Sequence, residues 1–294
     1  MKHIDNNLVQ KKMGSRLIQN NLAKFLFLLA TLFGLFVLVV LIYRVIRDGA
    51  GWIDFNFLTN RLSTDPEKAG IMGAILGTFW LMVVVAPVTM ILGIGTAIYL
   101  EEYAKKGRIQ SMIQTNIANL AGVPSVVFGL LGLTIFVRGI ELGNVVLAGG
   151  LTMALLVLPV VVVAAQEAVR AVPQFLREAS YGMGATKWQT IKNVVLPAAL
   201  PGILTGTILA LSRAIGETAP LIVIGIPALL IPFPEGIFDK FTILPVQIYY
   251  WTLDSALVAE YTNLAAATIV ILLIVLFLMN SIAIYIRNKF QKRF

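Results

Sequence analysis

The sequence has no cysteine, and its 294 residues include a single histidine, His3, in a polar N-terminal stretch. Disulfides, thiolate metal sites and cysteine nucleophiles are therefore excluded, and one histidine does not make a zinc site. Charged residues are scarce at 13%, whereas 58% of the residues are hydrophobic. Soluble domains carry about a quarter charged residues. A chain of this composition cannot cover a large water-facing surface.

The sequence also lacks any Gly-x-x-x-x-Gly-Lys-Ser/Thr loop, the motif that cradles the phosphates of a nucleotide. We therefore expect no cofactor or metal in this chain, and any ATP that drives it to be bound by a separate chain. The apolar runs contain one carboxylate, Glu217, and no polar cluster. A membrane enzyme would need a catalytic set, so we predict a protein without catalytic residues.

Hydrophobic residues gather in runs of roughly 20 or more, the length that crosses about 30 Å of hydrocarbon as a helix. We predict an all-α integral membrane protein with six transmembrane helices, at 25–43, 70–100, 112–137, 144–165, 198–226 and 264–286. The first run is too long for a signal peptide and ends in Arg44 and Arg47, so we expect a retained anchor. Residues 1–24 then form a cytoplasmic basic tail and 25–294 a single transmembrane domain.

The formal charge of +8 comes from residues that flank the apolar runs. This placement indicates membrane flanks rather than a nucleic-acid surface. With six spans, 16 Lys and Arg residues fall on the side of the termini, six fall on the other side, and Arg213 lies inside a span. Positive residues favour the cytoplasm, so we predict that both termini are cytoplasmic.

The connection 227–263 lies on the opposite, external side. Its prolines oppose a continuous helix, and Tyr249, Tyr250 and Trp251 suit a membrane interface, so we expect it to lie along the outer membrane surface. Gly73 and Gly77 are four residues apart, a spacing typical of close helix contacts. We list a tight interface at these glycines as a hypothesis.

The fifth run holds two charged residues, Arg213 and Glu217, near its middle. A charge at mid-membrane costs about 2.5–3.5 kcal/mol on insertion scales. Spaced four apart, the two side chains share a helix face and can pair. Either the pair locks helices together, or Arg213 is a way-station for an anion, since guanidinium donors suit an oxyanion. In the second case Glu217 holds Arg213 when no anion is present.

Two neighbours of this pair favour the pathway. Pro220 cannot donate to the carbonyl of Gly216, so the helix can bend there, and Gly216 leaves room for a close neighbour. We therefore predict a helix bend at Gly216 and Pro220. The residue types alone do not choose among phosphate, sulfate and molybdate.

The longest cytoplasmic connection, 170–197, has the pattern of two short helices. Pro173 suits a helix start, Gly184 separates the two pieces, and Trp188, Ile191 and Val195 recur at helical spacing. This pattern alone fits a helix resting on lipid as well as a knob for a soluble partner.

At this loop the sequence resembles the ABC importer permeases, whose signature is Glu-Ala-Ala, three residues, Gly, nine residues, Ile, one residue and Leu-Pro. Here Glu178-Ala179-Ser180, Gly184, Val194 and Leu196-Pro197 stand in that register. Ser180 and Val194 depart mildly from it. From residue 70 onward the chain resembles the PstA-type phosphate permeases, most closely in 95–103, 121–130 and 213–220.

The resemblance implies a type I ABC importer permease fold in a bacterial or archaeal inner membrane. It implies a heterodimer with a sister permease, two ATPase subunits that bind ATP, and an extracytoplasmic phosphate-binding protein. The ATPase contact would be made by Glu178, Ala179, Gly184, Leu196 and Pro197. The alternative is an ion-coupled carrier in which Arg213 and Glu217 form a relay. Such carriers often repeat a charged run in a second half, and no such repeat is present.

Overall fold

The computed structural model describes residues 6–227, 229 and 232–290, and these residues form helices with one isolated β-bridge between Val145 and Lys240. Five helical stretches within them are long and apolar enough to cross a membrane, and a sixth span is possible if one bent helix pair is counted. The predicted all-α membrane fold is confirmed.

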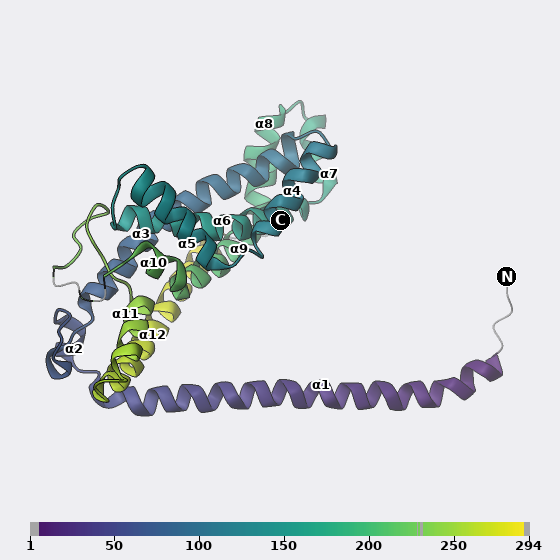
Figure 1. The fold of residues 1–294 in the computed structure, drawn as a ribbon. Coiled ribbons are helices and arrows are strands. Elements are labelled where there is room, and N and C mark those ends of the chain that lie inside the picture. Colours follow the sequence, from purple (N-terminus) through teal and green to yellow (C-terminus); the bar gives the residue numbers. More distant parts are fainter. Residues whose placement is uncertain (1–5, 228, 230–231, 291–294) are drawn as a thin grey trace.

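The first helix, α1 (Asn6–Gly49), is an arm that leaves the rest of the molecule (Figure 1). It meets the body near its C-terminal end, against α12 (Glu260–Phe290). None of its most apolar 18-residue window is buried. The helix begins at Asn6, so residues 6–24 of the predicted tail and the first span form one continuous helix, and the assignment of the tail to the cytoplasm stays a prediction. Residues 1–5 and 291–294 of the predicted cytoplasmic ends lie outside the described residues.

The core of the body is formed by α3 (Met72–Ile98), α6 (Val146–Arg170) and α9 (Leu196–Gly216). Buried apolar side chains of these helices pack together, among them Leu81, Val85, Met153, Val157, Val161, Ala210 and Ala214. Among the described residues, three π-helical turns extend helices, and one of them, η4 (Leu133–Gly139), follows α5 (Ser125–Gly132). The turn η3 (Tyr99–Tyr103) follows α3, and η5 (Ile191–Val195) joins α8 (Lys187–Thr190) to α9.

The predicted third span, 112–137, is not one continuous helix. It is divided into α4 (Arg108–Leu120) and α5 (Ser125–Gly132), and α5 continues into η4 (Leu133–Gly139). The helix axis bends by 101° between the two parts. Pro124 stands as the N-cap of α5. Because proline has no N–H to continue α4, the helix ends before it, and packing then sets the angle.

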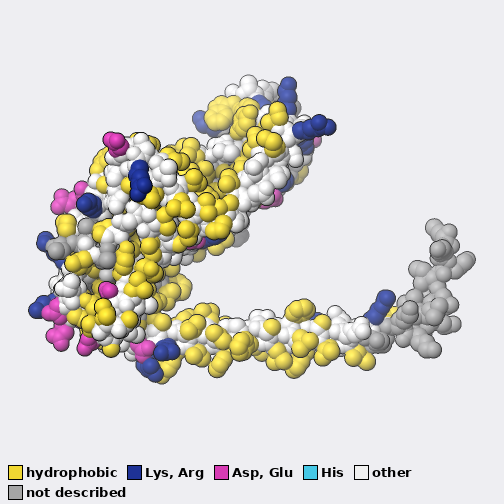
Figure 2. Space-filling view, viewed as in Figure 1, with side chains coloured by type: hydrophobic (Ala, Val, Ile, Leu, Met, Phe, Trp, Pro, Cys, Tyr) yellow, Lys and Arg dark blue, Asp and Glu magenta, His cyan; other side chains and the backbone are white. Residues whose placement is uncertain are grey.

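The predicted fifth span, 198–226, is also divided. The helix α9 ends at Gly216, Glu217 has an extended backbone, and α10 (Ala219–Ile224) begins two residues later. A further helix, α7 (Gln174–Gly182), precedes α8 at the far end of the body (Figure 1). Figure 2 shows Lys and Arg side chains at this end, over α4, α7 and α8, with apolar side chains covering the region between this end and α2.

The end opposite to α7 and α8 consists of η1 (Ala50–Trp52), α2 (Phe55–Thr59), η2 (Pro66–Lys68) and α11 (Leu244–Asp254). The prediction that 227–263 lies along the outer surface is wrong for its central part. Phe241, Ile243 and Leu244 are fully buried, and Trp251 packs against Phe57 with ring centroids 6.2 Å apart. This segment is folded into the body.

Gly77 explains how the buried segment fits. A Cβ atom there would collide with the backbone carbonyl of Thr242, whereas one at Gly73 would make ordinary contact with Phe233. The hypothesis of a tight interface holds for Gly77. The close neighbour is an irregular segment rather than a second helix.

Candidate anion pathway and coupling surface

The charged pair of the fifth span lies at the break between α9 and α10. Arg213 is in the last turn of α9, and its Nε donates to Oε1 of Glu217 at 3.2 Å. The predicted pairing is confirmed. Glu217 lies one residue beyond the helix, so the pair joins the helix end to the extended segment rather than sharing a helix face.

The pair is open on one side. The Arg213 side chain is 55% exposed in the single chain and that of Glu217 is 20% exposed. Among the described residues, Glu217 is the one acid paired with Arg213. A guanidinium so exposed on a membrane-spanning helix must face lipid, water or another subunit, and bare lipid is the costly choice.

Gly216 and Pro220 stand on either side of the break, where the sequence predicts a bend. The structure has a full interruption instead. Beyond it, Leu221 N and Ile222 N donate to the carbonyl of Thr218 and start a new helix. A Cβ at Gly216 would meet no atom within 4 Å. The close neighbour expected at Gly216 is therefore not found in the described part of this chain, and Gly216 borders the same open side as Arg213.

The position of α10 is set by α5. Gly129 lies so close to Pro220 and Val223 that a Cβ atom would come within 2.8–2.9 Å of them. This contact joins segments 121–130 and 213–220, which are far apart in the sequence. At the other end of α10, Nδ2 of Asn144 donates to the carbonyl of Gly225 at 3.0 Å. Sequence reasoning missed Gly129 and Asn144. The one available signal for Gly129 was the resemblance carried by segments 121–130 and 213–220, and Asn144 lies in neither.

Two polar contacts hold α9 against α12. Ser212 Oγ donates to Asn280 Oδ1 at 2.5 Å, one residue before Arg213. The second contact between the two helices is made by Arg287 of α12, whose Nη1 donates to Thr205 Oγ1 of α9 at 3.2 Å. These bonds orient the α9 face that carries Arg213 relative to α12.

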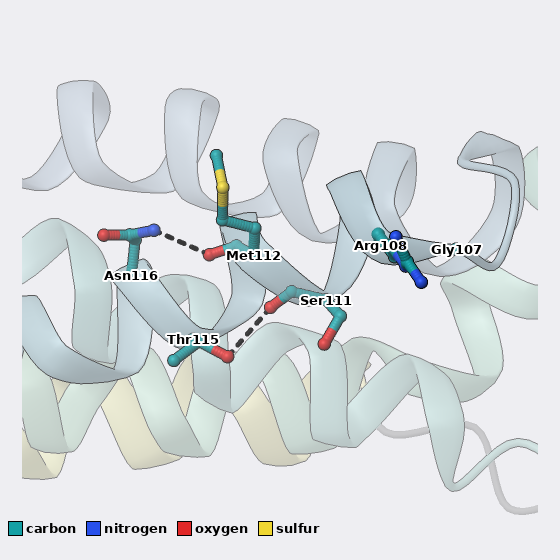
Figure 3. Close-up of a pocket in the computed structure, with 6 residues that line it drawn as sticks. All are labelled: Gly107, Arg108, Ser111, Met112, Thr115 and Asn116. Carbon is teal, nitrogen blue, oxygen red and sulfur yellow. Dashed lines mark hydrogen bonds between the residues drawn. The ribbon is translucent and has the colours of Figure 1, made fainter.

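The helix α4 has an unusually polar surface for a membrane protein. Gly107, Arg108, Ser111, Met112, Thr115 and Asn116 line an open hollow of about 580 Å³ (Figure 3). Thr115 Oγ1 donates to the carbonyl of Ser111 and Asn116 Nδ2 to that of Met112, at 2.9 and 2.8 Å. Since Thr115 and Asn116 donate within the helix, these two side chains do not indicate a ligand in the hollow.

The predicted coupling loop forms two short helices, as its pattern indicates. Pro173 is the N-cap of α7, and Gly184 follows α7 with a φ of +81°, a conformation that favours glycine. A capping box formed by Thr186 and Gln189 starts α8.

The structure brings only part of the predicted coupling set together. Glu178, Ala179 and Gly184 are exposed on α7 and the turn after it, whereas Leu196 and Pro197 are half-buried at the start of α9. Ile191 and Val195 are buried, but Trp188 is 57% exposed and Met183 88% exposed. The tip of the loop therefore offers an apolar surface that this chain does not cover.

The sequence profile of binding-protein-dependent transport system inner membrane components matches residues 89–293. The chain belongs to this family.

Curated relatives cover most of the chain. The "Phosphate transport system permease protein PstA" of Yersinia pestis is 32% identical over 280 residues, which span 93% of this chain and 92% of the relative. The protein of that name from Mycobacterium leprae is 37% identical over 80% of this chain and 78% of its own. The "Probable ABC transporter permease protein YqgI" of Bacillus subtilis is 34% identical over 71% of each chain.

Solved structures support the fold. A chain of a bacterial ABC transporter involved in the import of the acidic polysaccharide alginate has a TM-score of 0.66 at 18% identity and covers 95% of this chain and 100% of its own. A chain of the inward-facing MetNI methionine ABC transporter has a TM-score of 0.59 at 17% identity and covers 76% of this chain and 96% of its own. The predicted type I ABC importer permease fold is confirmed, and the chain is a multi-pass membrane protein.

The family match includes both candidate surfaces, the break at Arg213 and the loop around Gly184. It begins within α3 and leaves out α1, η1, α2 and η2. The parts that family members share are therefore the parts that carry the charged pair and the coupling loop. The roles of the individual residues stay predictions.

Proposed function

We propose that this chain is the membrane-spanning permease subunit of an ATP-driven importer of inorganic phosphate. The observation that carries the proposal is the Arg213 guanidinium at a helix break, held by one hydrogen bond to Glu217 and open on its other side. The relatives named as phosphate transport permeases support the choice of anion.

The chemistry of the break suits a passing oxyanion. Arg213 uses its Nε toward Glu217, and its other N–H donors have no partner among the described residues. A guanidinium has five donors in a planar fork, so the remaining ones fit two oxygens of a phosphate group. Glu217 supplies the countercharge when the site is empty. Arg213 then lowers the barrier for the anion without the tight binding that would stall it.

Surfaces that this chain leaves uncovered support the proposed partners. A sister permease would cover α1 and the open side of Arg213. Two ATPase subunits would dock below the two permeases, one of them on the loop with Trp188 and Met183. An extracytoplasmic phosphate-binding protein would deliver the anion at the opposite end. ATP is bound by the ATPase subunits in this proposal, and the complex lies in the inner membrane of a bacterium or archaeon with both termini cytoplasmic.

The test is to purify the tagged chain from a mild detergent and to reconstitute what co-purifies in vesicles with the binding protein. We expect a second permease and an ATPase to accompany it, and ATP-dependent accumulation of labelled phosphate. Sulfate and molybdate serve as competitors. Accumulation of another oxyanion in preference to phosphate would contradict the proposed substrate, and solute movement by the lone chain without nucleotide would contradict the importer.

A further inference from the structure

A second Arg–Glu pair lies where the coupling loop meets the membrane helices. Arg177 of α7 donates from Nε and Nη2 to Glu102 Oε1 of η3, at 3.2 and 3.1 Å. The two side chains are only 12% and 9% exposed, and the residues are 75 positions apart in the sequence. Such a buried charge is stable only with its partner in place.

The same guanidinium reaches the end of α6. Arg177 Nη1 donates to the carbonyl of Val172 at 2.6 Å and Nη2 to that of Val169 at 2.9 Å. One side chain thus joins the coupling helix α7 to the ends of both α3 and α6. The carbonyls at a helix C-terminus lack partners within the helix, which makes them suitable acceptors for a cation.

Besides Arg177, α7 is attached to the membrane helices through its half-buried Leu176, which packs against a buried cluster of α3, α6 and α9 side chains. It has no buried residue, and its hydroxyl contact, Ser180 Oγ to Thr190 Oγ1 at 2.9 Å, connects it to α8 within the loop. Between α7 and α8 the chain passes through the turn at Gly184. Without Arg177, movement of α7 would reach the membrane helices through the non-directional apolar contact of Leu176 and, along the chain, through this turn, α8 and η5.

The ends of α3 and α6 that receive Arg177 are themselves joined. Glu101 accepts from Arg170 Nη2 at 2.6 Å and from Gln166 Nε2 at 3.2 Å, and both donors belong to α6. Beneath them lies a buried cluster formed by Ala97, Ala165, Val169, Val172, Val195, Ala199 and Ile203. A displacement applied at Arg177 is therefore passed to α3 and α6 together.

The acceptor side is a π-helical turn, closed by a bond from Ala104 N to the carbonyl of Tyr99 at 2.8 Å. Such turns are rare and are frequent at functional sites. In η3 the consecutive residues Glu101 and Glu102 face different elements, Glu101 toward α6 and Glu102 toward α7.

We propose that Arg177 and Glu102 form a brace that carries the displacement of the coupling loop sideways into α3 and α6. This inference rests on the proposed function, because it assumes that an ATPase moves α7. Both are positioning residues that touch neither phosphate nor ATP. Loss of the brace leaves ATP hydrolysis intact but lets α7 move without the core helices.

The experiment uses the reconstituted complex and measures phosphate accumulated per ATP hydrolysed. Glu102→Gln and Arg177→Gln should each lower this ratio about tenfold while the ATPase still co-purifies. The matched control is Glu167→Gln, because Glu167 is 64% exposed and binds Arg170 one turn away on the same helix. In Glu167→Gln the phosphate accumulated per ATP hydrolysed should stay within twofold of the wild-type value. Equal losses in hydrolysis and accumulation would mean a purely structural role and overturn the brace.

A second variant tests the connection between α7 and η3 directly. It keeps the proposal testable if Glu102→Gln or Arg177→Gln misfolds. The sequence has no cysteine, so Glu102→Cys with Arg177→Cys places two thiols that a short bifunctional maleimide can join. The ratio should be low before cross-linking and recover at least half of the wild-type value afterwards. No recovery in a cross-linked, assembled complex would overturn the proposal.

The two proposals fail in different ways. A wild-type complex that does not accumulate phosphate refutes the proposed function. A wild-type complex that does so, together with an unchanged ratio in Glu102→Gln, refutes the brace alone.

Discussion

Two of the Arg–Glu pairs of this chain, Arg213–Glu217 and Arg177–Glu102, contain the same side chains in opposite surroundings. Arg213 and Glu217 are four residues apart, share one hydrogen bond, and leave Arg213 55% exposed. Arg177 and Glu102 come from different elements, are nearly buried, and Arg177 makes further bonds to two backbone carbonyls.

The difference bears on what each pair can do. An arginine with one bond and an open side can exchange its carboxylate for another anion at little cost. An arginine with four hydrogen bonds and little exposure to water cannot do so, because breaking the pair would leave an isolated buried charge. We therefore assign movement of the solute to the break at Arg213 and transmission of force to the coupling region at Arg177.

The largest effect is expected at the break. Arg213→Gln leaves the passing anion without a countercharge at the break. An unpaired charge at mid-membrane costs about 2.5–3.5 kcal/mol, so uptake should fall about a hundredfold. Labelled-phosphate uptake in vesicles measures this, with co-purification of the ATPase as the check on assembly.

The control is Arg44→Gln, which removes an arginine from another pair at i,i+4, with Asp48 near the end of α1. Uptake should stay within twofold of the wild type. Normal uptake in Arg213→Gln would make the exposed pair structural and remove the contrast between the two pairs.

The coupling region gives the next effect, at Gly184. A side chain in the left-handed conformation costs about 1–2 kcal/mol, which corresponds to about tenfold in coupling. Gly184→Ala should lower the stimulation of ATP hydrolysis by the loaded binding protein by about this factor, and Gly184→Glu should abolish it. Gly182→Ala is the control, because Gly182 ends α7 in open space. Equal effects of the two alanines would contradict a role for the turn.

A smaller effect is expected from the packing that positions the break. In Gly129→Val, the added atoms would meet Pro220 and Val223, and overpacking of this kind costs about 1–3 kcal/mol. The purified complex should lose its folded state at a lower temperature and take up phosphate severalfold more slowly. Gly95→Val is the comparison, since a Cβ at Gly95 meets no atom within 4 Å. If Gly129→Val behaves like Gly95→Val, the α5 to α10 contact does not hold the break in place.

The smallest effect is expected at the end of α10. Asn144→Ala removes the bond to the carbonyl of Gly225, and a hydrogen bond of this kind contributes about 1 kcal/mol. Uptake should fall about twofold to fivefold, with Asn144→Asp equally affected because a carboxylate cannot donate to the carbonyl. A full loss of uptake would mean that Asn144 acts on the solute directly.

Sequence reasoning reached the features set by local chemistry. Apolar runs predicted the spans, the spacing of Arg213 and Glu217 predicted their pairing, and Pro173 and Gly184 predicted two helices in the coupling loop. Each of these depends on residues within one or two helical turns.

The features that it missed depend on contacts between distant segments. Pro124 and Pro220 indicate where a helix can stop, but the 101° angle after α4 and the full break before α10 are set by packing. The burial of Phe241 requires the room that Gly77 leaves for Thr242. Arg177 counted in the sequence only as one cytoplasmic positive charge, since nothing local connects it to Glu102.

The central claim is that the open side of Arg213 borders the route of the anion, and one measurement tests it directly. Gly216→Cys places a single thiol of this chain beside the pair, where a Cβ meets no other atom. In the assembled complex we expect a charged, membrane-impermeant thiol reagent to modify this cysteine, and phosphate to slow the reaction during ATP turnover. A cysteine that the reagent never reaches, or that reacts at the same rate with and without phosphate, would contradict the claim.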